Sequence, residues 1–200
     1  MTPPLTRRRT PDSADARRRI LDAATDLFAR DGFDATATSA VARMAGVPKG
    51  LLFYHFPTKI DLLRHLLTER LPTSPLCTVA SVVVPGDIAA SLVGLHAELG
   101  LDQHQSLVLR IVVFREAQTH PEVGRHVRHL RAGLVAVTEE VLAAASPVPL
   151  DRDDRRAAAR TFVAVVLDHA NAERFGGAES DVEGAARLIA RGLYAGQLAR

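Results

Sequence analysis

The chain has 200 residues, which is enough for one or two modest domains, and its single cysteine, Cys77, excludes a disulfide framework and a cysteine-based zinc site. No apolar run reaches the roughly eighteen residues of a membrane-spanning helix, and no apolar segment follows the first charged residues as in a secretory signal, so we expect a cytoplasmic protein. Ala, Leu, Arg, Glu and Lys supply 91 of the 200 residues, a bias that predicts an all-α fold.

Charge is distributed unevenly along the chain. The formal net charge is only +2, but residues 1–70 hold ten Arg and two Lys against eight acidic residues, a net of +4, while residues 71–200 carry a net of −2. A basic N-terminal part on a slightly acidic body is expected when one end of a protein meets a polyanion; chance scatter is the alternative. The proline-flanked basic residues within 1–12 predict a disordered arm.

Within residues 13–60 the sequence predicts helices separated by glycines or by proline. The first predicted helix follows the N-cap candidates Asp12, Ser13 and Asp15, carries apolar residues at helical spacing, and ends at Gly32. Hydroxyls of residues 36–38 are expected to cap a second helix that ends at about Ala45. A third helix is expected from about Pro48 to His55. A fourth follows Pro57-Thr58, with one apolar stripe on Ile60, Leu63, Leu67 and Leu71.

Residues 61–200 are predicted to form a helical effector-binding and dimerisation domain, which gives the chain about nine helices. Beyond the fourth helix, helices are expected near 87–99, 103–119, 121–145, 152–175 and 180–198. The segment Val79–Val84 has the composition of a strand but no partner strand, so we interpret it as a buried connector or a helical extension. The helix near 121–145 has an apolar packing seam on Val123, Val127, Leu130, Leu134, Val137 and Val141.

Residues 36–59 have the dimensions of a helix-turn-helix motif, with two short helices joined by a turn centred on Gly46. Glycine suits this turn because it accepts a left-handed backbone without a Cβ clash. The second helix of this motif, from about Pro48 to His55, would carry on its exposed side Lys49, Gly50, Leu51, Phe53, Tyr54 and His55. Lysine can reach guanine acceptors or phosphate, glycine lets the backbone approach bases, and leucine and aromatic rings can contact thymine methyl groups. Phe53 and Tyr54 could instead be core aromatics.

The same segment resembles the DNA-binding domain of the TetR family of transcriptional regulators. The matching features are G-F-x-x-T at Gly32–Thr36, V-A-x-x-A-G-V at Val41–Val47, K-G at Lys49-Gly50 and Y-H-F-P-x-K at Tyr54–Lys59. The resemblance covers residues from about 17 to about 65, roughly a quarter of the chain, and the order of the motifs makes it specific.

The resemblance implies a role for each matching position. Thr38 and Ser39 would contact phosphate and sometimes a base, and His55 and Lys59 would contact phosphate. Lys49, Gly50, Leu51 and Tyr54 would read the major groove, and the arginines at 17–19 would lie near the DNA backbone. The chain departs from the family pattern at Phe53, where a tyrosine is usual, and at Pro48, where a serine or alanine is common.

The resemblance also implies a ligand-responsive transcriptional regulator, in the first instance a repressor that a small apolar effector releases from palindromic operator DNA. The alternative is an effector-independent dimeric DNA-binding regulator whose body is a solid helical core. An enzyme is not expected, and neither is a cofactor, because the sequence has no glycine-rich phosphate loop, nucleophile elbow or recognisable carboxylate pair.

The body offers candidate effector and dimer residues. His96, Arg110, Phe114, Gln118 and His169 place polar or aromatic groups on apolar helices and are candidates for a ligand cavity, although a histidine such as His169 could equally be a core residue. The helices near 152–175 and 180–198 are predicted to form a homodimer, and the resemblance implies that they pair across a two-fold axis, unless their apolar faces only close the core of one subunit. No metal site is predicted, since Glu122, His126 and His129 lie on the arginine-rich outer side of their helix.

Overall fold

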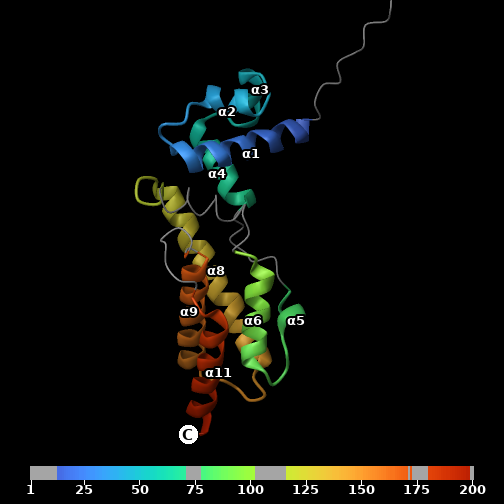
Figure 1. Cartoon of the computed structure of the whole chain (residues 1–200), viewed down its shortest axis with the longest axis vertical. Helices are drawn as coiled ribbons and strands as arrows, with labels where there is room; N and C mark the ends of the chain where they lie inside the picture. The colour runs from blue at the N-terminus through green and yellow to red at the C-terminus, as the bar shows by residue number, and fades with distance from the viewer. Residues whose placement is uncertain (1–12, 71–77, 102–115, 171, 173–179, 199–200) are drawn as a thin grey trace, which may run out of the picture. The chain divides into compact units, whose positions relative to one another are not determined.

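The computed structural model describes residues 13–70, 78–101, 116–170, 172 and 180–198 (Figure 1). This described part is all-α, with nine helices and no strand. The chain divides into two compact units, residues 1–66 and 67–200, so that the division falls inside the fourth helix. Within the described ranges, none of the helices combines the length and the apolar composition needed to cross a bilayer. The predicted arm of residues 1–12, Cys77 and most of the helix expected near 103–119 lie outside the described residues.

The N-terminal unit contains three complete helices and the start of a fourth. These are α1 (Ser13–Asp31), α2 (Thr38–Met44), α3 (Lys49–His55) and α4 (Lys59–Arg70). Helix α1 packs against both α2 and α3, and the unit has a core of fully or nearly fully buried side chains. This core includes Ile20, Leu21, Leu27, Phe28, Phe33, Val41, Leu52, Phe56, Leu62, Leu63 and Leu66. The buried side of α4 is therefore wider than the predicted stripe, and Ile60 is only half-buried.

One expected capping role and one expected helix start were wrong. Thr36 is buried, and its hydroxyl donates to the carbonyl oxygen of Gly32 at 2.6 Å, so it closes the end of α1 instead of capping α2. Among the described residues no side chain caps α2. Pro48 is the N-cap of α3, with an extended backbone at φ −60° and ψ 142°, and is not the first helical residue.

In the described part of the second unit, four helices pack in a ring, and a short helix, α5 (Val79–Val82), packs against two of them, α6 and α8. The four are α6 (Ile88–Leu99), α8 (Pro121–Ala145), α9 (Arg152–His169) and α11 (Val182–Leu198). Helix α6 contacts α8 and α11, and α9 contacts the same two helices, as Figure 1 shows from their side-by-side course. The interior is apolar, with Leu92 and Leu95 of α6, Val141 and Leu142 of α8, Phe162 of α9 and Ala186 of α11.

Local capping explains where several of these helices begin and end. The Asp87 carboxylate accepts a hydrogen bond from the Ala90 amide, and Gly100 ends α6 in a left-handed conformation with φ 52°. Asp151 caps α9 in the same way. Helix α9 ends at His169, earlier than the expected residue 175, at the point where the His169 ring meets the carbonyl oxygen of Ser180. In α8, Val127 and Leu130 of the predicted seam are only half-buried.

Candidate nucleic-acid interface

The turn between α2 and α3 is held by backbone hydrogen bonds and by one arginine of α1. Gly46 has a positive φ of 64°, a conformation that favours glycine, and the amide of Val47 donates to the carbonyl oxygen of Ala42 at 3.0 Å. Arg19 donates from Nη1 to the carbonyl oxygen of Ala45 at 3.1 Å. These hydrogen bonds hold the residues on either side of Gly46, and so they hold α2 and α3 at a fixed angle.

Helix α3 has one buried side and one exposed side. Leu52 and, just after the helix, Phe56 are completely buried in the core of the unit. Lys49, Gly50, Phe53 and Tyr54 are exposed, and Tyr54 leaves 77% of its surface in contact with solvent. Exposed apolar side chains that lie next to one another in a patch mark interaction sites. Neither Phe53 nor Tyr54 is a core residue, so that alternative interpretation was wrong.

The exposed side of α3 combines a cation with aromatic rings. The ammonium group of Lys49 lies 5.7 Å from the centroid of the Phe53 ring, and no atom lies within 4 Å of the Cβ position that Gly50 lacks. The backbone of α3 is consequently open to a close approach at Gly50. A lysine, an open backbone and two aromatic rings on one side of a short helix can supply phosphate, base-edge and thymine-methyl contacts.

Leu51 and His55 lie at the margins of this exposed side and are half-buried. The His55 ring packs between its neighbours, with centroids 5.2 Å from Tyr54 and 6.2 Å from Phe56. Its Nε2 atom is buried and has no hydrogen-bond partner among the described residues. That atom cannot reach a phosphate at the surface in this conformation. His55 is therefore less exposed than we expected from the sequence.

Lys59, the other lysine of the chain, is engaged within the unit. Its Nζ donates to the carbonyl oxygen of Asp34 at 3.0 Å and lies 4.6 Å from the centroid of the Phe33 ring. Thr58 and Asp61 cap the start of α4: the Asp61 amide donates to the Thr58 hydroxyl, and the Asp61 carboxylate accepts from the amide and the hydroxyl of Thr58. The Thr58 hydrogen bond lowers the pKa of Asp61 below 3.8, and desolvation opposes that shift.

The remaining predicted contact residues lie at the starts of α1 and α2. Thr38 is half-buried and Ser39 is exposed, both in the first turn of α2. Each arginine at 17–19 has a partner inside the unit: Arg17 lies 5.2 Å from the centroid of the Phe56 ring, Arg18 pairs with Asp15 at 2.7 Å, and Arg19 bonds Ala45. The sequence predicted these arginines near DNA and missed their structural partners. It also missed the Thr58–Asp61 cap, which the T-x-x-D pattern at 58–61 could have indicated.

The structure brings together two of the five candidate effector residues. His96 of α6 and His169 of α9 meet edge to face, with ring centroids 5.2 Å apart, and both are half-buried. Gln118 is exposed in the turn before α8 and so does not point into the body. Arg110 and Phe114 lie outside the described residues.

The predicted dimer helices bury several of their apolar residues inside one subunit. Phe162, Val163 and Val166 of α9 and Leu193 of α11 lie in the core, so these residues close the body itself. The apolar surface that these helices leave exposed is smaller than predicted. It includes Leu188, which is 68% exposed, and Gly192, where no atom lies within 4 Å of the missing Cβ. Hydrophobic periodicity reports that a face is buried, but it does not report by which chain.

Comparisons with known proteins agree with this geometry. The family model described as "Bacterial regulatory proteins, tetR family" matches residues 20–66, which include α2, α3 and their turn. The HTH-type transcriptional regulator SrpR of Pseudomonas putida is 32% identical over 66 residues, which cover 33% of this chain and 31% of SrpR. The chain thus spans about a third of that relative's length.

Longer matches cover both units. The HTH-type transcriptional repressor Rv1474c of Mycobacterium tuberculosis is 28% identical over 158 residues, 78% of this chain and 80% of that protein. The crystal structure of NalD, described as the secondary repressor of the MexAB-OprM multidrug efflux pump in Pseudomonas aeruginosa, has a TM-score of 0.62 at 24% identity and covers 91% of this chain and 98% of its own. These relatives are regulators, in agreement with the expectation that the chain is not an enzyme.

Proposed function

Because this chain belongs to the tetR family of bacterial regulatory proteins, we propose that it represses transcription as a homodimer that binds a palindromic operator through α3 and leaves it when a small apolar effector binds the body. The effector acts by binding more tightly to the dimer conformation whose α3 helices no longer fit successive major grooves.

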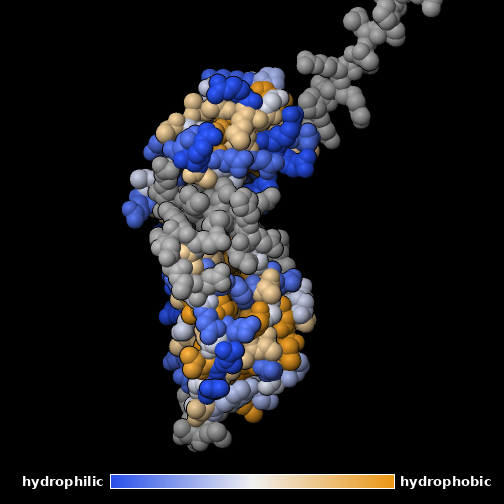
Figure 2. All heavy atoms as spheres, viewed as in Figure 1, coloured by the Kyte–Doolittle hydropathy of each residue, from blue (hydrophilic) through white to orange (hydrophobic). Residues whose placement is uncertain are grey.

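The observation that carries the proposal is the exposed side of α3. Lys49, Gly50, Phe53 and Tyr54 face solvent, while Leu52 fixes the opposite side of the helix in the core. In Figure 2, hydrophilic and hydrophobic residues are interspersed on the visible face of the N-terminal unit. Ser39 and Thr38 at the start of α2 would add contacts to the phosphate backbone, and Lys59 would do so only after its bond to Asp34 yields.

The effector would bind next to the paired rings of His96 and His169. These two side chains come from α6 and α9, on opposite sides of the ring of helices, so a molecule beside the two rings would contact both sides of the bundle. His169 is positioned by the carbonyl oxygen of Ser180 at 2.9 Å. Half-buried polar groups in an apolar bundle are the usual orienting groups of a ligand pocket.

The DNA-binding part of the proposal is tested by selection of bound sequences from a random DNA pool, followed by titration of the selected duplex. We expect a two-fold symmetric consensus and a complex of two chains per duplex. Lys49→Ala should abolish the enrichment, whereas Arg187→Ala, on the exposed surface of the body, should leave it unchanged. A pool that shows no enrichment, or an asymmetric site bound by one chain, would contradict the proposal.

The effector part needs a separate measurement, because an effector-independent regulator would pass the first test. A panel of lipophilic ligands is screened by thermal shift, and each hit is tested for release of the selected duplex. We expect hits that raise the melting temperature and release DNA, and His96→Leu with His169→Leu should weaken both effects. Hits that stabilise the protein without any effect on DNA binding would favour the effector-independent alternative.

A further inference from the structure

A groove on the outside of the body has arginines as half of its lining residues. It lies between α8 and α9 and has a volume of about 540 Å³. Its charged lining residues are Arg128, Arg131 and Glu139 of α8 with Arg156 and Arg160 of α9, and its apolar part is Ala132, Val135 and Ala136. His96 and His169 are not among the lining residues, so this groove is separate from the proposed effector site.

The positive charge of the groove is largely uncompensated. Glu139 is the single acidic residue of the lining, and it lies 4.0 Å from Arg156, at the limit of an ion pair. Within the described part of the chain, Arg128, Arg131 and Arg160 have no ion-pair partner. Arg156 and Arg160 are one helical turn apart, a spacing at which like charges repel.

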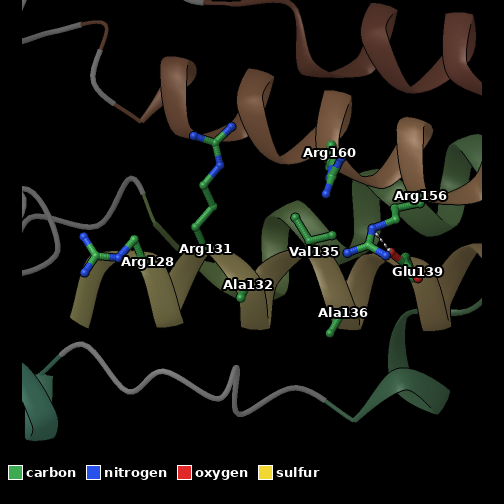
Figure 3. Close-up of a pocket in the computed structure, with 8 residues that line it drawn as sticks. All are labelled: Arg128, Arg131, Ala132, Val135, Ala136, Glu139, Arg156 and Arg160. Atoms are coloured by element: carbon green, nitrogen blue, oxygen red, sulfur yellow. Dashed lines mark ion pairs between the residues drawn. The ribbon is translucent and has the colours of Figure 1, made fainter. Parts of the chain in front are cut away.

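The arginines converge from the two walls. Figure 3 shows the side chain of Arg131 extending from α8 toward α9 and that of Arg160 extending from α9 toward α8, with Val135 between them. A guanidinium presents its donors in a planar fork that fits two oxygens of a phosphate or carboxylate. Two forks on opposite walls can grip an anion that occupies the space between the helices.

The charge also restricts the possible occupant. A second copy of this chain placed symmetrically on the groove would bring arginines against arginines, since a two-fold interface uses the same surface on both subunits. The volume lies within the range of pockets for small molecules, on the order of 300–1,000 Å³. A small anion therefore fits both the sign of the charge and the size of the space.

We propose that this groove binds a phosphate-bearing small molecule with a short apolar group, its phosphate held by Arg131 and Arg160 and its apolar group against Val135. Arg128 adds long-range attraction, and the Glu139–Arg156 pair closes one end of the site. The bound anion would join α8 to α9 and thereby give the regulator a second input, distinct from the apolar effector.

The test is calorimetric titration of the full chain, at about 0.15 M salt, with inorganic phosphate and with hexyl phosphate. We expect one site per chain, with hexyl phosphate bound more tightly than inorganic phosphate because of its apolar group. Arg131→Gln and Arg160→Gln should each weaken binding about tenfold, the usual effect of losing one charged hydrogen-bonding group. The matched control is Arg187→Gln, which changes the same charge on α11 outside the groove and should alter affinity less than about twofold.

Further measurements separate the other possible occupants. Melting temperatures of all variants should stay unchanged, since the substituted arginines are on the surface. Equal loss of anion binding in all three arginine variants, or no loss when Arg131 and Arg160 are both replaced, would overturn the proposal. Three other results would also overturn the proposal. The protein could bind phosphatidate vesicles but not hexyl phosphate, or it could prefer an acidic peptide. Arg131→Gln and Arg160→Gln could also weaken the affinity for operator DNA.

Discussion

Arg19 and Ala45 are 26 residues apart, yet the Arg19 guanidinium donates to the Ala45 carbonyl oxygen over 3.1 Å. The same side chain pairs through Nε with the Asp15 carboxylate at 3.2 Å, so it is held on α1 while it reaches the turn that follows α2. A residue of the first helix thus sets the position of α3, the helix whose exposed side we propose to read DNA.

Replacing Arg19 should loosen this connection. Arg19→Met keeps most of the aliphatic stem but loses the hydrogen bond, so we expect a loss of about 1 kcal/mol in the free energy of unfolding, the value of one ordinary hydrogen bond. DNA affinity should fall on operator and random duplexes alike. Urea unfolding and fluorescence anisotropy measure the two effects. Arg18→Met is the control for stability, because Arg18 pairs with the neighbouring Asp15 at the surface and its loss should leave the free energy of unfolding unchanged. An equal loss of stability in the two variants would refute the role of Arg19.

Two glycines of the motif should respond to alanine in opposite ways. Gly46 has φ +64°, so Gly46→Ala introduces strain of roughly 1–2 kcal/mol, although the nearest atom to the new Cβ, Arg19 Nη1, is 3.5 Å away. Gly50 lies inside α3 with open space around it, and Gly50→Ala should stabilise the protein by about 0.5–1 kcal/mol. The added methyl group should nonetheless weaken operator binding. Thermal unfolding measures the two changes in stability, and duplex titration measures operator binding. A shift of stability in the same direction in both variants would contradict this prediction.

The two lysines should differ in what they contribute. Lys49 stands on the exposed side of α3, so Lys49→Ala should weaken operator binding more than random-DNA binding, by about 1–3 kcal/mol if it reads a base. Lys59 is bonded to Asp34 and stacked on Phe33, so Lys59→Ala should lower both affinities equally and also lower stability, by about 0.5–1 kcal/mol for the cation–π contact. Competition titrations with both duplexes measure the ratio. An unchanged ratio in Lys49→Ala would remove the base-reading role.

The sequence predicted the elements whose signals are local. Helix α6 was expected at 87–99 and lies at Ile88–Leu99, because Asp87 and Gly100 mark its ends through interactions within one turn. Thr36 shows where local signals fail to predict a contact. Its hydroxyl was expected to cap α2, but in the folded chain it donates to the carbonyl oxygen of Gly32. The arginine groove was not predicted at all, since its two walls are about two dozen residues apart in sequence and converge only when α8 packs on α9.

Predictions about partners were less complete for a physical reason. Apolar periodicity in the last two helices pointed to a buried face, and Phe162 and Val166 proved to be buried by their own chain. The same pattern is produced whether the covering surface belongs to one subunit or to another. On α3 the distinction was easier, since exposed aromatic residues next to a buried Leu52 have few explanations within a monomer.

Acid should remove the contribution of the α4 cap. The pKa of Asp61 is lowered below 3.8 by the Thr58 hydrogen bond, so the stability it confers is fully present above that value and is lost as the pH falls through the lower pKa of the folded state. The difference in free energy of unfolding between the natural protein and Asp61→Asn should be constant above about pH 5 and shrink below it. Urea titrations at several pH values measure this. A growing difference for Asp61→Asn in acid would contradict the assignment.

Leu188 should decide whether α9 and α11 form the dimer. It is 68% exposed on α11, one turn before Gly192, whose open backbone would admit a partner helix. Leu188→Ser removes an apolar contact that a two-fold interface makes twice, so we expect a shift to monomer in light scattering and weaker operator binding, with helical content retained. Val148→Ser is the matched control, an exposed apolar residue at 46% in the loop after α8. If Leu188→Ser remained a dimer while Val148→Ser dissociated, the interface would have to lie at the loop end of α8 instead.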